Sequence, residues 1–297
     1  MVRTPRDSAS PSIQIEVEIA ASPESVWRAI TDPGELVRWF APEAVIRPGA
    51  GGRIWLSWGG GVEAEWRIAC WEPGRYLRTA EVAALGGRTV ADGDETPSLA
   101  GIRERSVEYA IEPRGRSAVL RLHHSGFPPS WEGSESLDGI RRGWAFELLS
   151  LRHYLERHHG TPRVVAQVRR VVSLPPRETW MRLMKALGAA KEPRAQQEFS
   201  YRSATGDRLT GLIAILDRPH QLVALVANFN DAVLRVKTAA ANGGGLETTV
   251  WLAAYGVPAS RVRAFEGRWV TVLEGLAPAA AAGAPVGVES LCEGKPA

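Results

Sequence analysis

The pattern of apolar and polar positions predicts a series of antiparallel strands in the first half of the chain. The segment IQIEVEI (13–19) alternates strictly between apolar and polar residues, as a strand with one buried face does. Five more segments of strand character follow, separated mostly by Gly and Pro, at 52–58, 62–71, 75–82, 105–113 and 117–124. The segment 83–101 is predicted to be a long hairpin loop.

Two short helices are predicted after the first strand. Ser22 suits the N-cap and Pro23 the first helical position. The stretch TDPGE (31–35) ends this helix. ELVRWF (35–40) then predicts a second short helix that closes before Pro42.

A long amphipathic helix ends the series. Its apolar residues recur at spacings of four, three and four, at Trp144, Leu148, Leu151 and Leu155. This spacing predicts a helix of about five turns within 138–159. A curved sheet leaves its concave face uncovered, so we expect the helix to lie across that face.

The second half of the chain repeats the first. The segments 115–130 and 245–260 align without a gap and share five identical pairs: Gly115/Gly245, Leu122/Leu252, Gly126/Gly256, Pro128/Pro258 and Ser130/Ser260. The segments 164–183 and 209–226 repeat the earlier patterns in the same order. The sequence therefore predicts a tandem repeat of one fold.

The repeat gives a domain plan. We predict a first domain at 13–159, a linker at 160–163 and a second, divergent domain at 164–277. The ends, 1–12 and 278–297, are predicted to be disordered because they lack a sustained helical or strand period.

Several stretches of the first domain resemble one known family. They are ASPESVWRAITDPGELVRWFAP, RPGAGGRIW, EPGRYLRT and the ending with HSGF followed by GW. They are similar to bacterial relatives of the C-terminal domain of the heat-shock-protein-90 ATPase activator, in the START/birch-pollen-allergen (SRPBCC) superfamily. The resemblance covers 13–159 well and 164–277 more weakly. It implies an α+β fold with two helix-grip domains, each a curved antiparallel sheet wrapped around a long C-terminal helix.

The resemblance also implies a cavity for an apolar or amphipathic small molecule. Strand alternation and the helix face then predict eight ligand-binding residues: Leu56, Trp58, Trp66, Tyr109, Leu122, His124, Trp144 and Leu148. The fold that the resemblance implies adds Trp39 and Phe40, which makes ten. Trp39 and Phe40 could form a wall or lid at the cavity mouth, or pack into the core. A completely filled core would show the same alternation, so the pattern predicts the faces better than the space between them.

His124 is the most notable polar residue in this set. An imidazole can act as a general acid or base near neutral pH. No orienting partner lies close to it in sequence, and the repeat has Ala254 at the matching position. We therefore predict no catalytic residues. Were the cavity that of a cyclase or hydrolase, His124 and Tyr109 would be its best acid–base pair.

The composition and the motifs limit the kinds of partner and cofactor that we expect. The net charge is +3 and the 36 basic residues, only four of them lysine, are scattered among 33 acids, which argues against nucleic-acid binding. No phosphate-binding loop or nucleophile motif occurs, so no cofactor is predicted. His153, His158 and His159 lie at the end of the long helix, where cations complement the helix dipole, and no metal site is predicted.

The apolar runs and the cysteines indicate the cellular compartment. No apolar run approaches the length of a membrane span, and two distant cysteines give no disulfide framework, so we expect a cytoplasmic protein.

Three functions follow from the sequence. We favour non-catalytic binding of a hydrophobic or amphipathic small molecule by the first domain. The alternatives are an enzyme that uses the cavity and a chaperone ATPase cofactor. The activator's separate Asn/Trp-rich domain has no counterpart here, because none of the three asparagines adjoins a tryptophan. In the second domain, MKALGAAKEPRAQQ (184–197) replaces the Pro-Gly turn and the Trp-Phe pair. We therefore expect a smaller or collapsed cavity there, with the two domains packed together.

Overall fold

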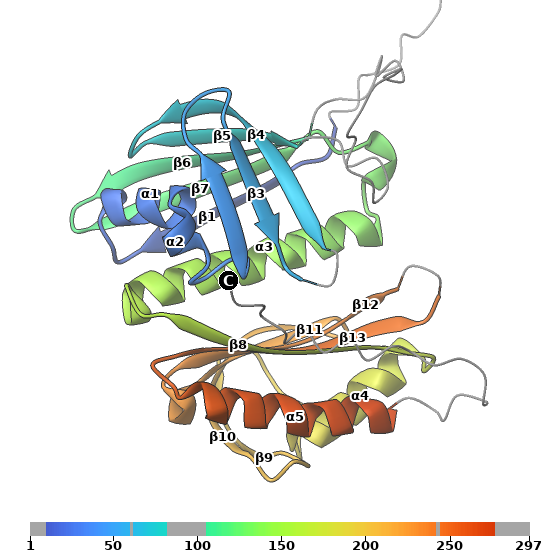
Figure 1. Ribbon diagram of the computed structural model, residues 1–297. Helices are drawn as coiled ribbons and strands as arrows, with labels where there is room; N and C mark the ends of the chain where they lie inside the picture. The colour runs from blue at the N-terminus through green and yellow to red at the C-terminus, as the bar shows by residue number, and fades with distance from the viewer. Residues whose placement is uncertain (1–9, 60–61, 82–104, 242–243, 277–297) are drawn as a thin grey trace, which may run out of the picture.

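The protein folds into two antiparallel sheets, each with a long helix (Figure 1). The computed structural model describes residues 10–59, 62–81, 105–241 and 244–276. The two layers of sheet and helix are stacked, with the first half of the chain above the second in the view of Figure 1. The predicted class, α+β with two helix-grip domains, is confirmed.

The first sheet has seven strands in the order β1-β7-β6-β5-β4-β3-β2. Their bounds are β1 (Ile13–Ile19), β2 (Glu43–Arg47), β3 (Arg53–Ser57), β4 (Glu63–Glu72), β5 (Tyr76–Glu81), β6 (Ser106–Arg114) and β7 (Ser117–Ser125). The strands predicted from alternation are present. The edge strand β2 was not predicted, and its burial alternates only between exposed and intermediate.

Helices α1 (Pro23–Thr31) and α2 (Pro33–Leu36) follow β1. Ser22 Oγ accepts a hydrogen bond from the Ser25 amide at 3.2 Å, which confirms the predicted N-cap. The position predicted for the second helix was wrong, because it begins at Pro33 instead of within 35–40. Asp32 ends α1, and its carboxylate accepts from the Glu35 amide at 3.0 Å and so starts α2 directly.

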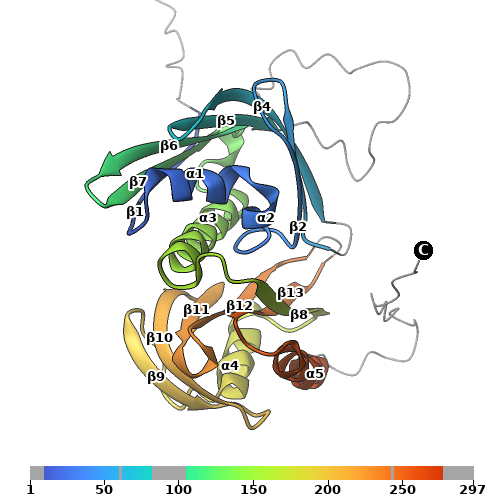
Figure 2. The same ribbon diagram turned by 60° about the vertical axis from the view of Figure 1, so that its left-hand side comes forward.

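The first half closes with a short 3₁₀ turn, η1 (Pro129–Trp131), and the long helix α3 (Glu135–His153). One π-helical turn, η2 (Tyr154–His158), extends it. The helix crosses the concave face of the first sheet, as predicted (Figure 2).

The second sheet has six strands in the order β8-β13-β12-β11-β10-β9. Its elements are β8 (Arg163–Val172), α4 (Pro176–Leu187), β9 (Gln197–Arg202), β10 (Arg208–Asp217), β11 (Gln221–Val226), η3 (Ala227–Phe229), β12 (Ala232–Ala240), β13 (Leu246–Tyr255) and α5 (Ala259–Leu276). This is the order of the first sheet without a counterpart of β2. Both sheets also carry an irregularity in the equivalent strand pair, β4–β5 and β10–β11. These shared features support a tandem repeat.

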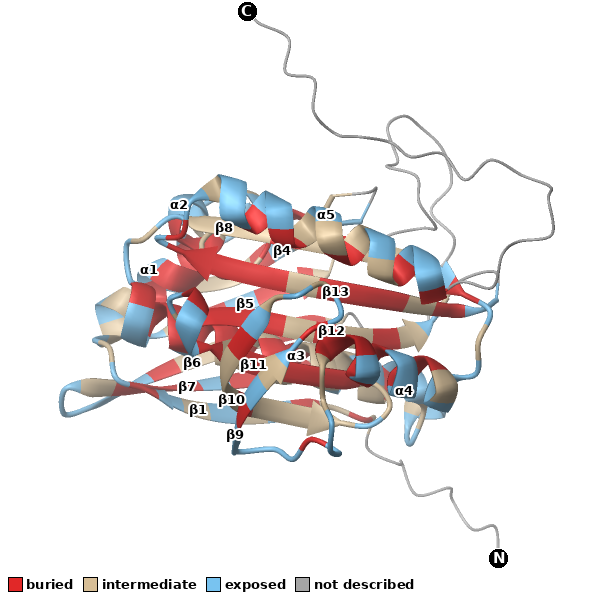
Figure 3. Ribbon diagram, turned by 90° about the horizontal axis from the view of Figure 1, so that it is seen from below, coloured by how far each residue is buried: buried red, intermediate tan, exposed pale blue. Residues whose placement is uncertain are grey.

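Large apolar side chains of α5 are buried against the second sheet. Phe265, Trp269 and Leu273 are at most 1% exposed within one apolar core. Buried, intermediate and exposed positions alternate along α5, whereas most of β13 is buried (Figure 3). The expected collapse of the second cavity stays a prediction.

The two domains pack tightly against each other through α3. Phe146 of α3 lies in a small apolar cluster with Val223, Val233 and Ala253 of β11, β12 and β13. Tyr255, at the end of β13, belongs to the core of the first domain. One face of α3 therefore contacts the first sheet, and another face of the same helix contacts the second sheet.

Some predictions concern residues outside those described. The loop at 83–101, the tail at 278–297 and most of the segment 1–12 fall there. The domain limits proposed from the sequence remain predictions. None of the helices in the described part of the chain has both the length and the apolar character that crossing a bilayer requires.

Candidate functional site

A cavity of about 250 Å³ lies between the concave face of the first sheet and α3. Its walls are mostly apolar and come from α1, α2, β3, β4, β5, β6 and α3. Trp39, Trp58, Trp66 and Trp144 are among them. Such a wall suits an apolar ligand, and the volume is slightly below the range of about 300–1,000 Å³ common for ligand pockets. We call this space the cavity.

The aromatic pair after α2 forms one wall of the cavity. Phe40 stacks on Trp39 with ring centroids 4.9 Å apart and meets the edge of Trp58 at 5.5 Å. It also stacks against Trp144 of α3 at 6.2 Å. Trp39 is 1% exposed and its Nε1 donates to the Ala29 carbonyl at 2.8 Å. Trp39 therefore serves both core and cavity wall, and Phe40 is a half-buried wall residue.

The cavity contains few polar groups. Thr79, Tyr109 and Glu147 are the polar side chains with hydroxyl or carboxyl groups in its lining. Burial raises the pKa of Tyr109, and the charge of Glu147 adds to this rise. Burial raises the pKa of Glu147 to about 7, while Arg235, Arg163 and Lys237 act in the opposite direction. Glu147 Oε2 has no hydrogen-bond partner among the described residues.

The structure separates the ten predicted residues into two groups. Those that line the cavity are Trp39, Phe40, Leu56, Trp58, Trp66, Tyr109 and Trp144. Leu122, His124 and Leu148 do not line it, and they are 1%, 5% and 2% exposed. These three lie deeper, where the sheet and the helix touch. Alternation predicts which side chains of a strand point toward the helix. It does not predict where along the strand those side chains touch the helix and where they border a cavity.

His124 is a buried partner of the long helix. Its Nδ1 accepts a hydrogen bond from Trp144 Nε1 at 2.9 Å, and its ring lies 4.5 Å from that of Phe127. Tyr109 lines the cavity and His124 does not, and no hydrogen bond joins them among the described residues. The geometry that an acid–base pair would need is therefore absent from this part of the structure. Burial, together with the charges of Arg105 and His123, lowers the pKa of His124 from 6.5 to about 4.

The lowered pKa predicts a loss of stability in acid. The native state favours neutral His124, so the unfolded chain binds more protons between pH 6.5 and pH 4. The contribution of neutral His124 to the free energy of unfolding is fully present above pH 6.5. It decreases as the pH falls, and about 2 kcal/mol of it is lost at pH 5. His124→Asn keeps an acceptor near the Nδ1 position and does not titrate. Urea unfolding at pH 5 and pH 8 should show a smaller acid loss for this variant. Glu147 titrates in both proteins and cancels, so an equal loss would contradict the assignment.

Sequence reasoning missed the cavity residues of α3 that face away from the main apolar stripe. Ile140, Gly143 and Glu147 all line the cavity. They follow one another at spacings of three and four, so they form a single helical row. The row would have been found by asking which side of α3 the second domain covers.

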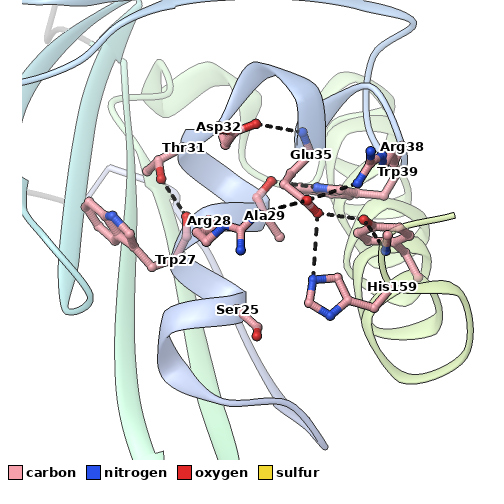
Figure 4. A network of polar contacts seen from close by, with 12 residues as sticks. Ser25, Trp27, Arg28, Ala29, Thr31, Asp32, Glu35, Arg38, Trp39 and His159 are labelled. Carbon is pink, nitrogen blue, oxygen red and sulfur yellow. Dashed lines mark hydrogen bonds and ion pairs between the residues drawn. The ribbon is translucent and has the colours of Figure 1, made fainter. Parts of the chain in front are cut away.

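A buried polar network holds the segment that carries Trp39 (Figure 4). Glu35 of α2 is 4% exposed. Its carboxylate accepts from the Tyr154 hydroxyl at 2.6 Å and from Arg38 Nη1 at 3.0 Å. His159 Nε2 lies 3.9 Å from Oε2 of the same carboxylate. The network ties α2 to the end of the long helix.

The second domain also holds this wall. Arg163 at the start of β8 donates to the Phe40 carbonyl at 3.1 Å. The Tyr255 hydroxyl donates to the Arg38 carbonyl at 2.8 Å. Both contacts reach the segment directly after α2, so the aromatic wall of the cavity depends on the neighbouring domain.

The His residues of the long helix have structural contacts. His153 Nε2 lies 2.6 Å from the Asp231 carbonyl, and the His158 ring stacks on Tyr255 at 4.3 Å. In the ranges that the structure describes, no three His, Cys, Asp or Glu side chains come together as ligands for a metal ion.

A cavity between a curved sheet and a long helix defines the helix-grip class. Residues 20–156 match the model of the family described as Activator of Hsp90 ATPase homolog 1-like protein. The first domain of this chain is therefore similar to that family. No curated protein matches the sequence.

Several solved structures are similar to this chain. The Aha1 dimer from Colwellia psychrerythraea is 21% identical, with a TM-score of 0.40, and the match covers 50% of this chain and 99% of that one. Protein MLL2253 from Mesorhizobium loti is 24% identical, with a TM-score of 0.40, over 50% of this chain and 98% of its own. DynU16, from the dynemicin biosynthetic locus, is 18% identical, with a TM-score of 0.39, over 89% of this chain and 98% of its own.

Proposed function

We propose that the first domain binds a small hydrophobic or amphipathic molecule in the cavity, without catalysis. The observation that carries the proposal is the cavity itself, about 250 Å³ with a wall of aliphatic and aromatic side chains. Apolar surface shielded from water by a ligand supplies the binding energy. The modest volume favours a compact ligand. A cytoplasmic location is part of the same proposal.

The proposal predicts binding of a neutral apolar dye. N-phenyl-1-naphthylamine should bind the purified protein, and the nearby tryptophans should transfer excitation energy to it. Ala64 of β4 lines the cavity, so Ala64→Phe should fill part of it and raise the dissociation constant about tenfold. A fluorescence titration measures both effects.

The control places the same side chain elsewhere. Val171 on β8 is 56% exposed, and Val171→Phe adds a phenyl ring to the surface of the second domain. This variant should bind the dye as the native protein does. Absence of dye binding, or equal losses in both variants, would overturn the proposal.

A chaperone role is the second candidate, and it is favoured by the family match. It predicts that the protein stimulates the ATPase of a heat-shock protein of the Hsp90 class. A steady-state ATPase assay with and without this protein decides between the two roles. Stimulation that Ala64→Phe leaves intact would favour the chaperone role over the ligand-binding one.

A further inference from the structure

A second hollow lies beside α3, where the helix faces the second sheet. It has a volume of about 270 Å³ and is enclosed by α3 and by the outer face of the second sheet at β8, β12 and β13. We call it the interdomain cleft. Figure 2 shows α3 passing between the first sheet and these strands.

The cavity and the interdomain cleft meet along one side of α3. Phe40, Trp58, Gly143 and Glu147 line both spaces. A Cβ atom added at Gly143 would have no atom within 4 Å apart from its chain neighbours and the nearby backbone of α3 itself, so the helix is unobstructed there. A molecule that fills the cavity can therefore extend past Gly143 toward the second domain.

The interdomain cleft carries more positive charge than its own carboxylates balance. Arg235 and Lys237 lie two residues apart on β12 and line it. The side-chain amino group of Lys237 has no ion pair within 4.0 Å and no hydrogen bond among the described residues, and Arg235 Nε is buried without a partner. Glu247 is within 3.8 Å of Arg169 and is thereby engaged. Two cations of β12 are left for an incoming group.

Burial disfavours the charged form of both cations, and Arg235 further disfavours that of Lys237. Burial lowers the pKa of Arg235 to about 10, and it lowers the pKa of Lys237 with a further contribution from Arg235. The Arg235 guanidinium lies 4.1 Å from the ring centroid of Phe146 and donates to Gln221 Oε1 at 2.9 Å. These contacts fix its position but supply no negative charge.

Glu147 cannot fully supply the missing charge. No ion pair within 4.0 Å joins it to a described cation, although Arg163, Arg235 and Lys237 all face it from the second domain. Tyr109 faces it from the first sheet. Because its pKa lies near 7, its carboxyl group is partly protonated at neutral pH. A protonated carboxyl can donate a hydrogen bond to an anionic neighbour.

We propose that the interdomain cleft binds the anionic end of a hydrophobic carboxylic acid whose apolar part occupies the cavity. Arg235 and Lys237 contact the carboxylate, and the aromatic wall contacts the apolar part. Charge-assisted hydrogen bonds of this kind are stronger than neutral ones. This inference rests on the proposed function and adds the chemical class of the ligand.

Three probes with the same chain test the charge preference. Decanoate, decan-1-ol and decylamine are titrated into the full-length protein by isothermal titration calorimetry at neutral pH. Decanoate should bind about tenfold more tightly than decan-1-ol, and decylamine should be the weakest of the three. Equal affinity of decanoate and decan-1-ol, or tighter binding of decylamine, would overturn the inference and leave the proposed function intact. Failure of all three probes to bind would overturn the proposed function itself.

Variants that remove one positive charge test whether Arg235 and Lys237 cause the preference for decanoate. Lys237→Gln and Arg235→Gln should each reduce the preference for decanoate several-fold and leave the affinity for decan-1-ol unchanged. Lys237→Gln is the safer of the two, because Arg235 also packs on Phe146. Arg170→Gln is the matched control, since Arg170 lies on β8 and pairs with Glu274 outside the cleft. A preference that survives both cleft variants, or that Arg170→Gln reduces equally, would refute the assignment.

Discussion

Replacing Tyr255 with alanine should lower the free energy of unfolding by about 3–5 kcal/mol, the usual cost of truncating a large buried aromatic side chain. Tyr255 is 1% exposed and extends from the last strand of the second domain into the core of the first. It stacks on His158 with an interplanar angle of 8°. Alanine would remove this packing and the hydrogen bond to the Arg38 carbonyl together. The two domains should then unfold less cooperatively.

Urea unfolding followed by tryptophan fluorescence and by circular dichroism measures both effects. Tyr255→Phe is the control, because it keeps the ring and removes only the hydroxyl that donates to Arg38. Its cost should be about 1 kcal/mol. If alanine cost no more than phenylalanine, the packing of the ring between the domains would not be the source of the stability.

Replacing Glu35 with alanine should cost a similar amount, about 3–5 kcal/mol, because it leaves the partners of a buried carboxylate without their acceptor. Tyr154, which donates to Glu35 at 2.6 Å, is 0% exposed and cannot turn to water. Arg28 is mostly exposed, and its contact at 3.5 Å should add little. Most of the lost stability should come from the Tyr154 hydroxyl and Arg38, which would both lose their acceptor.

The Glu35 variant also tests how the cavity wall is held. The network fixes α2, and Trp39 and Phe40 lie shortly after its end at Leu36. Glu35→Ala should therefore weaken binding of N-phenyl-1-naphthylamine as well. Glu35→Gln keeps an oxygen acceptor for Tyr154 and should cost only about 1–2 kcal/mol. Chemical unfolding and the dye titration are made on the same samples. A Glu35→Ala protein as stable as the native one would exclude the network as a support of the wall.

The alternation of strands and the helical spacing predicted most elements of the first domain correctly. Strand β1 and the N-cap at Ser22 depend on local chemistry, and the structure confirms both. The second short helix was misplaced because Asp32 acts as the end of one helix and the cap of the next, which the Pro-Gly signal concealed.

The candidate site was predicted less completely than the fold. The aromatic residues of the inner face were found, because alternation identifies them. His124 was predicted to line the cavity, but it lies deeper on the same face, where it accepts a hydrogen bond from Trp144 of α3. Glu147 was missed because its surroundings are charged residues of the second domain, far away in sequence.

The sequence by itself determined the repeated order of strands and helices and the apolar faces that form each core, because both arise from short-range periodicity. Only the tertiary structure decided which of the two cores keeps a cavity and what adjoins it. Trp269 is completely buried in the core of the second domain, whereas the aromatic wall of the first borders a cavity beside α3. Charges from β12 reach that helix only because the second sheet packs against its outer side. Distances across a domain interface depend on the packing of whole elements, which no local pattern encodes.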